Sequence, residues 1–194
     1  MNNDNIKQLR NETGISVMQC KKALEEAGGD MEQARILLRK ESANIAEKKS
    51  DRELGAGVVA SYVHAGAQIG VLIELFCESD FVAKNTEFVS LANDIAMHVA
   101  AMKPRWVNSN DITDDERDQA RKSFQSDIDA MDDKSEDIKE KIMQGKLDTF
   151  FDEATLMKQT FVKDPNVTVE GLINQATQKL GERIQVGTIT RLAI

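Results

Sequence analysis

The sequence predicts an α+β fold: three short helices, then a small three-stranded antiparallel sheet packed with helices, and an antiparallel helical hairpin inserted into this second part. Three observations support that order. Apolar residues have helical spacing over the first 54 residues, alternate from Gly57 onward, and return to helical spacing in an acidic stretch at residues 111–154. We therefore expect two domains, residues 1–54 and 55–194, with the acidic stretch inserted in the second.

The first 54 residues contain the start and stop signals of three helices. We expect the first helix to end near Thr13-Gly14. Ser16 and Asp30 each precede a glutamine by three residues, a capping spacing that predicts the starts of the second and third helices. Cys20 is spaced as a core residue of the second helix. Three short helices of this kind predict a small bundle.

A change to two-residue periodicity predicts strands. Runs at residues 58–64 and 69–77 flank Ala65-Gly66-Ala67-Gln68, which indicates a hairpin, and residues 185–192 form a third candidate strand. Two helices accompany the sheet, one that Thr86 can cap and one at residues 168–180, with an irregular stretch before the latter.

The second strand is apolar on both faces. Its two sets are Val71, Ile73, Leu75 and Cys77 on one face and Leu72 and Phe76 on the other. One helical layer covers only one face of a sheet, so the other face needs a partner surface. We expect a homodimer through the core sheet.

The acidic stretch, residues 111–154, holds fifteen acidic and seven basic residues and accounts for the whole net charge of −8. Thr113 with Glu116 has capping-box spacing, Ser135 can cap a second helix with Ile138 on its apolar stripe, and Gly145 can end that helix. The stretch therefore predicts two antiparallel helices with a thin apolar seam.

Composition excludes several classes of function. The acidic net charge argues against binding nucleic acid, and no apolar run reaches the length of a membrane span. The chain contains no phosphate-binding loop sequence and no nucleophile elbow. Two cysteines and two histidines suggest neither a disulfide framework nor a zinc site, and we expect His98 on the surface or half-buried. These observations predict a non-enzymatic cytoplasmic protein without cofactor or metal, and the missing leader favours the cytosol.

Gly55-Ala56-Gly57 matches a dinucleotide-binding pattern, which requires a strand before the glycines and a helix after them. Here the order is reversed, which favours a flexible junction. An NAD-dependent enzyme is the alternative that this motif leaves open.

The segment between the second strand and the next helix has two interpretations. In one, Ser79 or Asp80 turns the chain while Phe81 and Val82 pack into the core. In the other, Phe81 is an exposed apolar wedge beside a carboxylate, as in a protein-binding anchor.

Three separated blocks resemble, in order, signatures of the bacterial translation elongation factor Ts family: Cys20-Lys21-Lys22-Ala23-Leu24, Glu78-Ser79-Asp80-Phe81-Val82-Ala83-Lys84, and Ile95-Ala96-Met97-His98-Val99-Ala100-Ala101. The resemblance covers nearly the whole chain. It implies a guanine-nucleotide exchange factor that binds elongation factor Tu in its GDP-bound and nucleotide-free states, with a ubiquitin-associated-like three-helix bundle at the start. The chain resembles the short form, with one core copy where longer members have two, which agrees with a homodimer.

The resemblance also implies where the partner is contacted. The family's Thr-Asp-Phe-Val segment, assigned to displacing Mg²⁺ from the partner's nucleotide site, matches Ser79, Asp80, Phe81 and Val82, with Ser79 replacing the threonine.

A second candidate contact is the start of the second helix: Val17, Met18, Lys21 and Lys22. Its alternative is that Met18 belongs to the core and the lysines are only solvated. A different function, a three-helix adaptor for ubiquitin-like or nascent-chain partners without exchange activity, also stays open.

Overall fold

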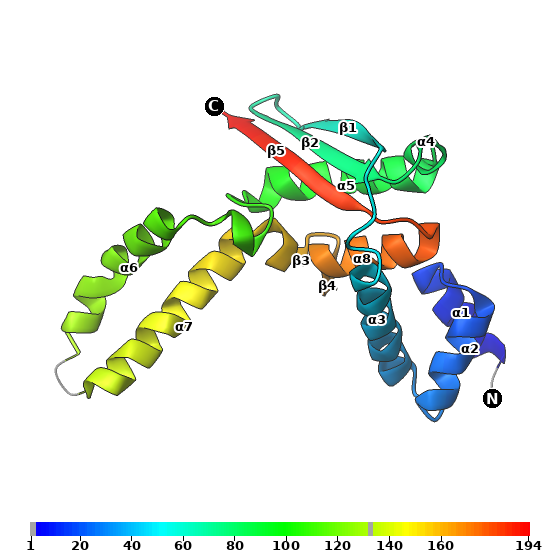
Figure 1. The fold of residues 1–194 in the computed structure, drawn as a ribbon, viewed down its shortest axis with the longest axis horizontal. Coiled ribbons are helices and arrows are strands. Elements are labelled where there is room, and N and C mark those ends of the chain that lie inside the picture. Colours follow the sequence, from blue (N-terminus) through cyan, green and yellow to red (C-terminus); the bar gives the residue numbers. More distant parts are fainter. Residues whose placement is uncertain (1–2, 132–133) are drawn as a thin grey trace. The chain divides into compact units, whose positions relative to one another are not determined.

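The computed structural model describes residues 3–131 and 134–194, and it confirms the predicted α+β class (Figure 1). Within those ranges it contains eight α-helices, a three-stranded antiparallel sheet in the order β1-β2-β5, and a two-stranded sheet of β3 and β4. Two compact units divide the chain: the residues up to Ala100 together with Glu170–Ile194, and Ala101–Val169. The predicted domain division at residue 54 stays a prediction.

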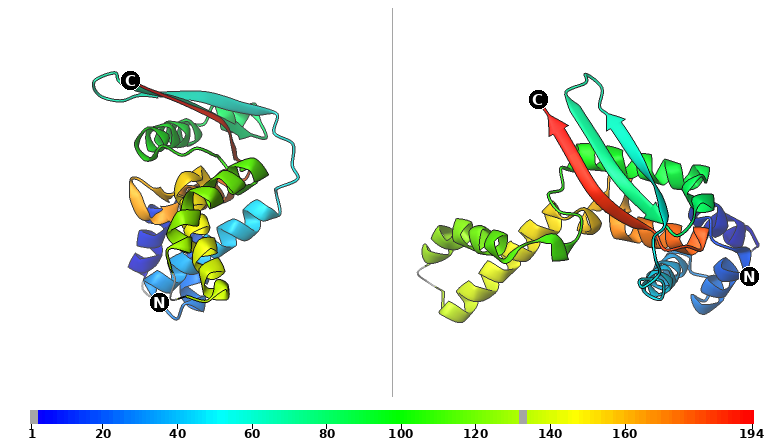
Figure 2. Two further views of the ribbon diagram at one scale, coloured as in Figure 1. Left: turned by 90° about the vertical axis from the view of Figure 1, so that its left-hand side faces the viewer. Right: turned by 45° about the horizontal axis from the view of Figure 1, so that its top comes forward.

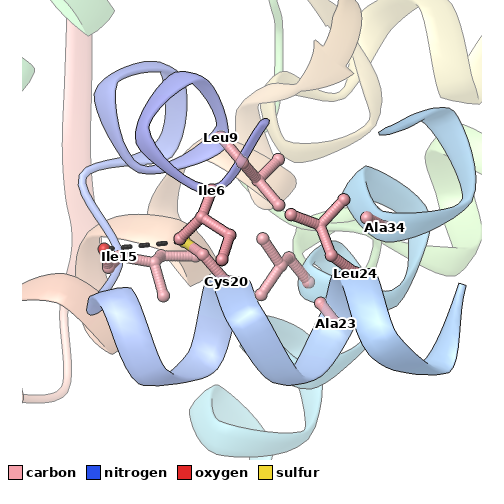
Figure 3. Close-up of a cluster of buried hydrophobic side chains, with 8 residues drawn as sticks. Ile6, Leu9, Ile15, Cys20, Ala23, Leu24 and Ala34 are labelled. Carbon is pink, nitrogen blue, oxygen red and sulfur yellow. Dashed lines mark hydrogen bonds between the residues drawn. The ribbon is translucent and has the colours of Figure 1, made fainter. Parts of the chain in front are cut away.

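The first three helices are α1 (Asn3–Thr13), α2 (Val17–Glu26) and α3 (Met31–Glu47). The side chains of Ser16 and Asp30 accept hydrogen bonds from the third backbone N–H of α2 and α3, which confirms both predicted starts. A shared core joins the three helices, with Cys20 inside it as predicted (Figure 3). Its buried members are Ile6, Leu9, Ile15, Cys20, Ala23, Leu24, Ala34 and Leu38.

The three-stranded sheet consists of β1 (Ala56–Val63), β2 (Ile69–Cys77) and β5 (Gln185–Ala193), all predicted within one or two residues. Helix α5 (Thr86–Met102) lies along one face of the sheet, as Figures 1 and 2 show. Arg191 Nε of β5 donates to the carbonyl of Ala100 in that helix, at 3.2 Å. The four β2 residues on this face, from Val71 to Cys77, are buried.

Helix α5 differs in detail from the prediction. Asn85, not Thr86, caps its start, because Asn85 Oδ1 accepts from the Glu87 N–H at 2.8 Å. His98, expected on the surface or half-buried, is completely buried. The helix therefore turns His98 inward with its apolar neighbours.

The opposite face of the sheet, which we call the outer sheet face, carries exposed apolar side chains: Val59, Val63, Leu72 and Leu192. Phe76 also lies on this face and explains two glycines. A Cβ on Gly187 would come within 2.4 Å of the Phe76 ring, and one on Gly57 would come within 3.1 Å of that ring and 2.5 Å of the Leu75 carbonyl oxygen. Gly57 lies inside strand β1, where it permits close packing within the sheet, and a strand instead of a helix follows Gly55, contrary to a dinucleotide-binding turn.

The second unit contains the predicted helical hairpin, α6 (Asp114–Asp129) and α7 (Glu136–Ala154). The capping box of Thr113 and Glu116 is confirmed. The predicted end at Gly145 is wrong, because α7 continues to Ala154 and buries Met143, Leu147 and Phe151.

Two further details of the second unit were wrongly expected. Ile138, placed on the apolar stripe of the hairpin, is 46% exposed. The stretch predicted to be irregular pairs β3 (Thr160–Phe161) with β4 (Asp164–Thr168) before α8 (Val169–Leu180).

Candidate functional site

The candidate site is a single helical turn, α4 (Asp80–Ala83), between β2 and α5. Ser79 caps the turn, and its Oγ accepts a hydrogen bond from the Val82 N–H at 3.4 Å. Val82 is 3% exposed, whereas Phe81 is 83% exposed. Each of the two interpretations of this segment therefore holds for one residue. Val82 packs into the core, whereas the ring of Phe81 faces solvent beside Asp80.

Two carboxylates hold the backbone that leads into α4. Glu182, in the turn between α8 and β5, accepts hydrogen bonds from the N–H groups of Glu78 and Ser79 at 3.1 and 3.0 Å. It also accepts one from Ser79 Oγ at 2.5 Å. In return, Glu78 accepts from the Arg183 N–H at 2.5 Å and from Arg52 Nη1 at 3.2 Å. The Arg183 N–H and then the Arg52 guanidinium hold the pKa of Glu78 below its ordinary value.

Sequence reasoning missed Glu182 and Arg183. They lie about a hundred residues from Ser79 in the chain, and neither belongs to a local motif. Only the pairing of β2 with β5 brings the two segments together. No signal in a single sequence identifies such a contact.

The thiol beneath α4 is not prepared for nucleophilic chemistry. Burial raises the pKa of Cys77, and its Sγ donates to the carbonyl of Ser79 at 3.3 Å. In the part of the chain that the structure describes, no three residues of the metal-binding types cluster as a metal site, and no described helix is long and apolar enough to cross a membrane. What α4 offers is therefore an apolar ring and a carboxylate on a braced turn.

The second candidate contact lies at the start of α2. Met18 is 76% exposed and Val17 is 47% exposed, so the interpretation of Met18 as a core residue is wrong. Lys21 and Lys22 each lie 3.8 Å from a glutamate one helical turn further on, with much of each side chain exposed. These residues are accessible to a partner, but their role in binding stays a prediction.

Comparison with known proteins gives one consistent result. The family model described as Elongation factor TS matches residues 3–193. Proteins named elongation factor Ts from Thermosipho melanesiensis and Thermotoga maritima are each 46% identical to the chain. The alignment with the Thermosipho protein spans 97% of the chain and 96% of that relative. The alignment with the Thermotoga protein spans 98% of the chain and 94% of that relative. A relative of the same name from Carboxydothermus hydrogenoformans is 41% identical over 97% of the chain and 87% of its own length.

Proposed function

The chain belongs to the elongation factor Ts family, the exchange factors of translation elongation, and we propose that it releases GDP from elongation factor Tu by disturbing the partner's Mg²⁺ and phosphate site. One observation carries the proposal: the ring of Phe81 is 83% exposed on a turn that Ser79 caps and that the buried Val82 anchors in the core. Exposing a phenyl ring forfeits the free energy of burying it, which a partner pocket can recover.

The mechanism requires no covalent step. A nucleoside diphosphate such as GDP is held largely by backbone N–H groups around its phosphates and by Mg²⁺ with its oxygen ligands. Inserting Phe81 beside those elements shifts them, and the Asp80 carboxylate disturbs the ligand shell of the metal. Coupling between two ligands is reciprocal, so GDP weakens binding of the factor as much as the factor weakens binding of GDP. Rebinding of a nucleotide then releases the factor for another cycle.

Phe81 alone is insufficient. A 10,000-fold acceleration needs about 5.5 kcal/mol of barrier reduction, and one interface anchor supplies about 2–4 kcal/mol. We assign a second contact to the exposed start of α2: Val17, Met18, Lys21 and Lys22. Methionine adapts to an irregular surface, and the lysines extend their charges toward acidic groups of the partner.

The active form is proposed to be a homodimer. The outer sheet face exposes Val59, Val63, Leu72 and Leu192, by fractions between 51% and 72%. Several exposed apolar side chains on one face of a sheet are characteristic of an interface. We propose a second copy of the chain as the partner that covers this face.

The test is release of labelled GDP from elongation factor Tu. We expect the unmodified protein to accelerate release, Phe81→Ala to lose about thirtyfold or more of the acceleration, and Asp80→Ala to lose less. Ile36→Ala, which truncates a half-exposed apolar side chain on α3, is the matched control. Absence of acceleration by the unmodified protein would remove the proposal and favour the adaptor function. If the Phe81→Ala and Asp80→Ala variants accelerated release as well as the unmodified protein, the proposed roles of Phe81 and Asp80 would be contradicted.

A further inference from the structure

Two segments far apart in the sequence brace each other at the candidate site. The Glu182 carboxylate accepts from two successive backbone N–H groups and the hydroxyl of Ser79, and the Glu78 carboxylate accepts from the backbone N–H of Arg183. Each segment thus supplies a carboxylate to the backbone of the other. Hydrogen bonds to ionised acceptors are the strong kind, and several that converge fix orientation as well as position.

The turn that carries Glu182 is itself anchored. Helix α8 ends at Leu180, and Gly181 adopts a left-handed φ of +77°, as is common after a helix C-terminus. Lys49 Nζ donates to the Gly181 carbonyl, and Arg183 Nη1 donates to the Arg52 carbonyl at 2.5 Å. Glu182 is therefore held from both sides and can act as a fixed support.

The position of Phe81 depends on this support. Ser79 caps the start of α4, and Phe81 follows two residues later in the chain. With 83% of its surface exposed, the ring has little packing of its own to hold its direction. A single turn of helix is not stable alone, so its orientation depends on tertiary contacts: the fixed backbone of Glu78 and Ser79 at its start and the buried side chains of Val82 and Ala83.

We propose that Glu182 is a positioning residue for nucleotide exchange: by fixing the backbone of Glu78 and Ser79, its carboxylate directs the ring of Phe81 at the partner. This inference rests on the proposed function of Phe81. It predicts that Glu182 affects the rate of exchange within the complex more than it affects formation of the complex, which the other contacts support.

The experiment measures GDP release from elongation factor Tu over a range of factor concentrations, which separates the maximal rate from the half-saturating concentration. We expect Glu182→Ala to lower the maximal rate about tenfold, the effect of losing a hydrogen bond to a charged group. The half-saturating concentration should change less than about threefold. Glu182→Gln keeps an acceptor and should regain most of the rate. Glu53→Ala, in the exposed segment before β1, is the matched control and should leave both quantities unchanged.

A double-mutant cycle distinguishes positioning from general stabilisation. If Glu182 acts through Phe81, Glu182→Ala should change the rate less than about twofold in a Phe81→Ala background. An equal loss in both backgrounds, or no loss with Phe81 present, would overturn the inference. Failure of the proposed function is a different result, namely that Phe81→Ala alone exchanges normally. If circular dichroism shows that Glu182→Ala does not fold, Glu182→Asp, whose carboxylate is one methylene shorter, replaces it under the same criteria.

Discussion

At the scale of single residues, Glu78 makes stability depend on pH. The Arg183 N–H and then Arg52 lower its pKa from the ordinary 4.5, so these contacts stabilise the fold above that pH and are lost as pH falls through the folded-state pKa. We expect Glu78→Gln to be less stable than the unmodified protein at pH 7 and the difference to shrink as the pH falls below 4.5, in urea unfolding measured at a series of pH values. Glu53→Gln is the control. A difference that persists at low pH would contradict the assignment.

Met18 tests the second contact separately. Because its side chain is 76% exposed at the start of α2, Met18→Ala removes partner contacts without opening a cavity. We expect the half-saturating concentration of the factor in GDP release to rise about fivefold, and the maximal rate to stay within about twofold. Ile36→Ala should change neither. A fall in the maximal rate alone would show that Met18 acts on exchange itself, as Phe81 does, and not on binding of the partner.

At the scale of elements, helix α7 gives a prediction through Gly145. A Cβ there meets no atom within 4 Å, and the residue has no left-handed φ. Gly145→Ala should therefore raise the free energy of unfolding by about 0.5–1 kcal/mol. Gly28 also has open space but a φ of +62°, so Gly28→Ala should destabilise the protein by about 1 kcal/mol. Thermal unfolding of both variants measures the contrast, and equal effects would contradict it.

The elements that sequence reasoning found are those fixed by local chemistry. Ser16, Asp30 and Thr113 cap the helices that follow them, and alternation located the strands. Gly145 misled because the cost of glycine in a helix is about 1 kcal/mol, less than the gain from burying large apolar residues of the next turns such as Phe151.

Contacts between residues far apart in the chain could not be predicted from the sequence, for a different reason. The two residues of β3 (Thr160–Phe161) carry no alternation that can be read, and they form a strand only through pairing with β4. The support from Glu182 requires knowing which strands are neighbours. The sequence thus located the candidate turn of Phe81, whereas the groups that hold it emerged only from the fold.

At the scale of the whole molecule, the exposed apolar side chains of the outer sheet face carry the prediction of a homodimer. Leu72 lies near its centre, paired with Ser61 of β1 and Thr190 of β5, and it is 51% exposed. A dimer across this face would bury Leu72 against the second copy. Leu72→Lys would place a charge there, and the cost of removing that charge from water opposes association.

We expect the unmodified protein to sediment as a dimer at micromolar concentration and Leu72→Lys as a monomer. Ile36→Lys adds the same charge at a half-exposed apolar position on α3 and should leave the dimer intact. If two chains together supply what longer family members carry in one, the monomeric variant should also accelerate GDP release less, even though its Phe81 is unchanged. An unmodified protein that sediments as a monomer would contradict the dimer. A monomeric Leu72→Lys variant with full exchange activity would instead show that one chain suffices for exchange, and the apolar face would then serve assembly alone.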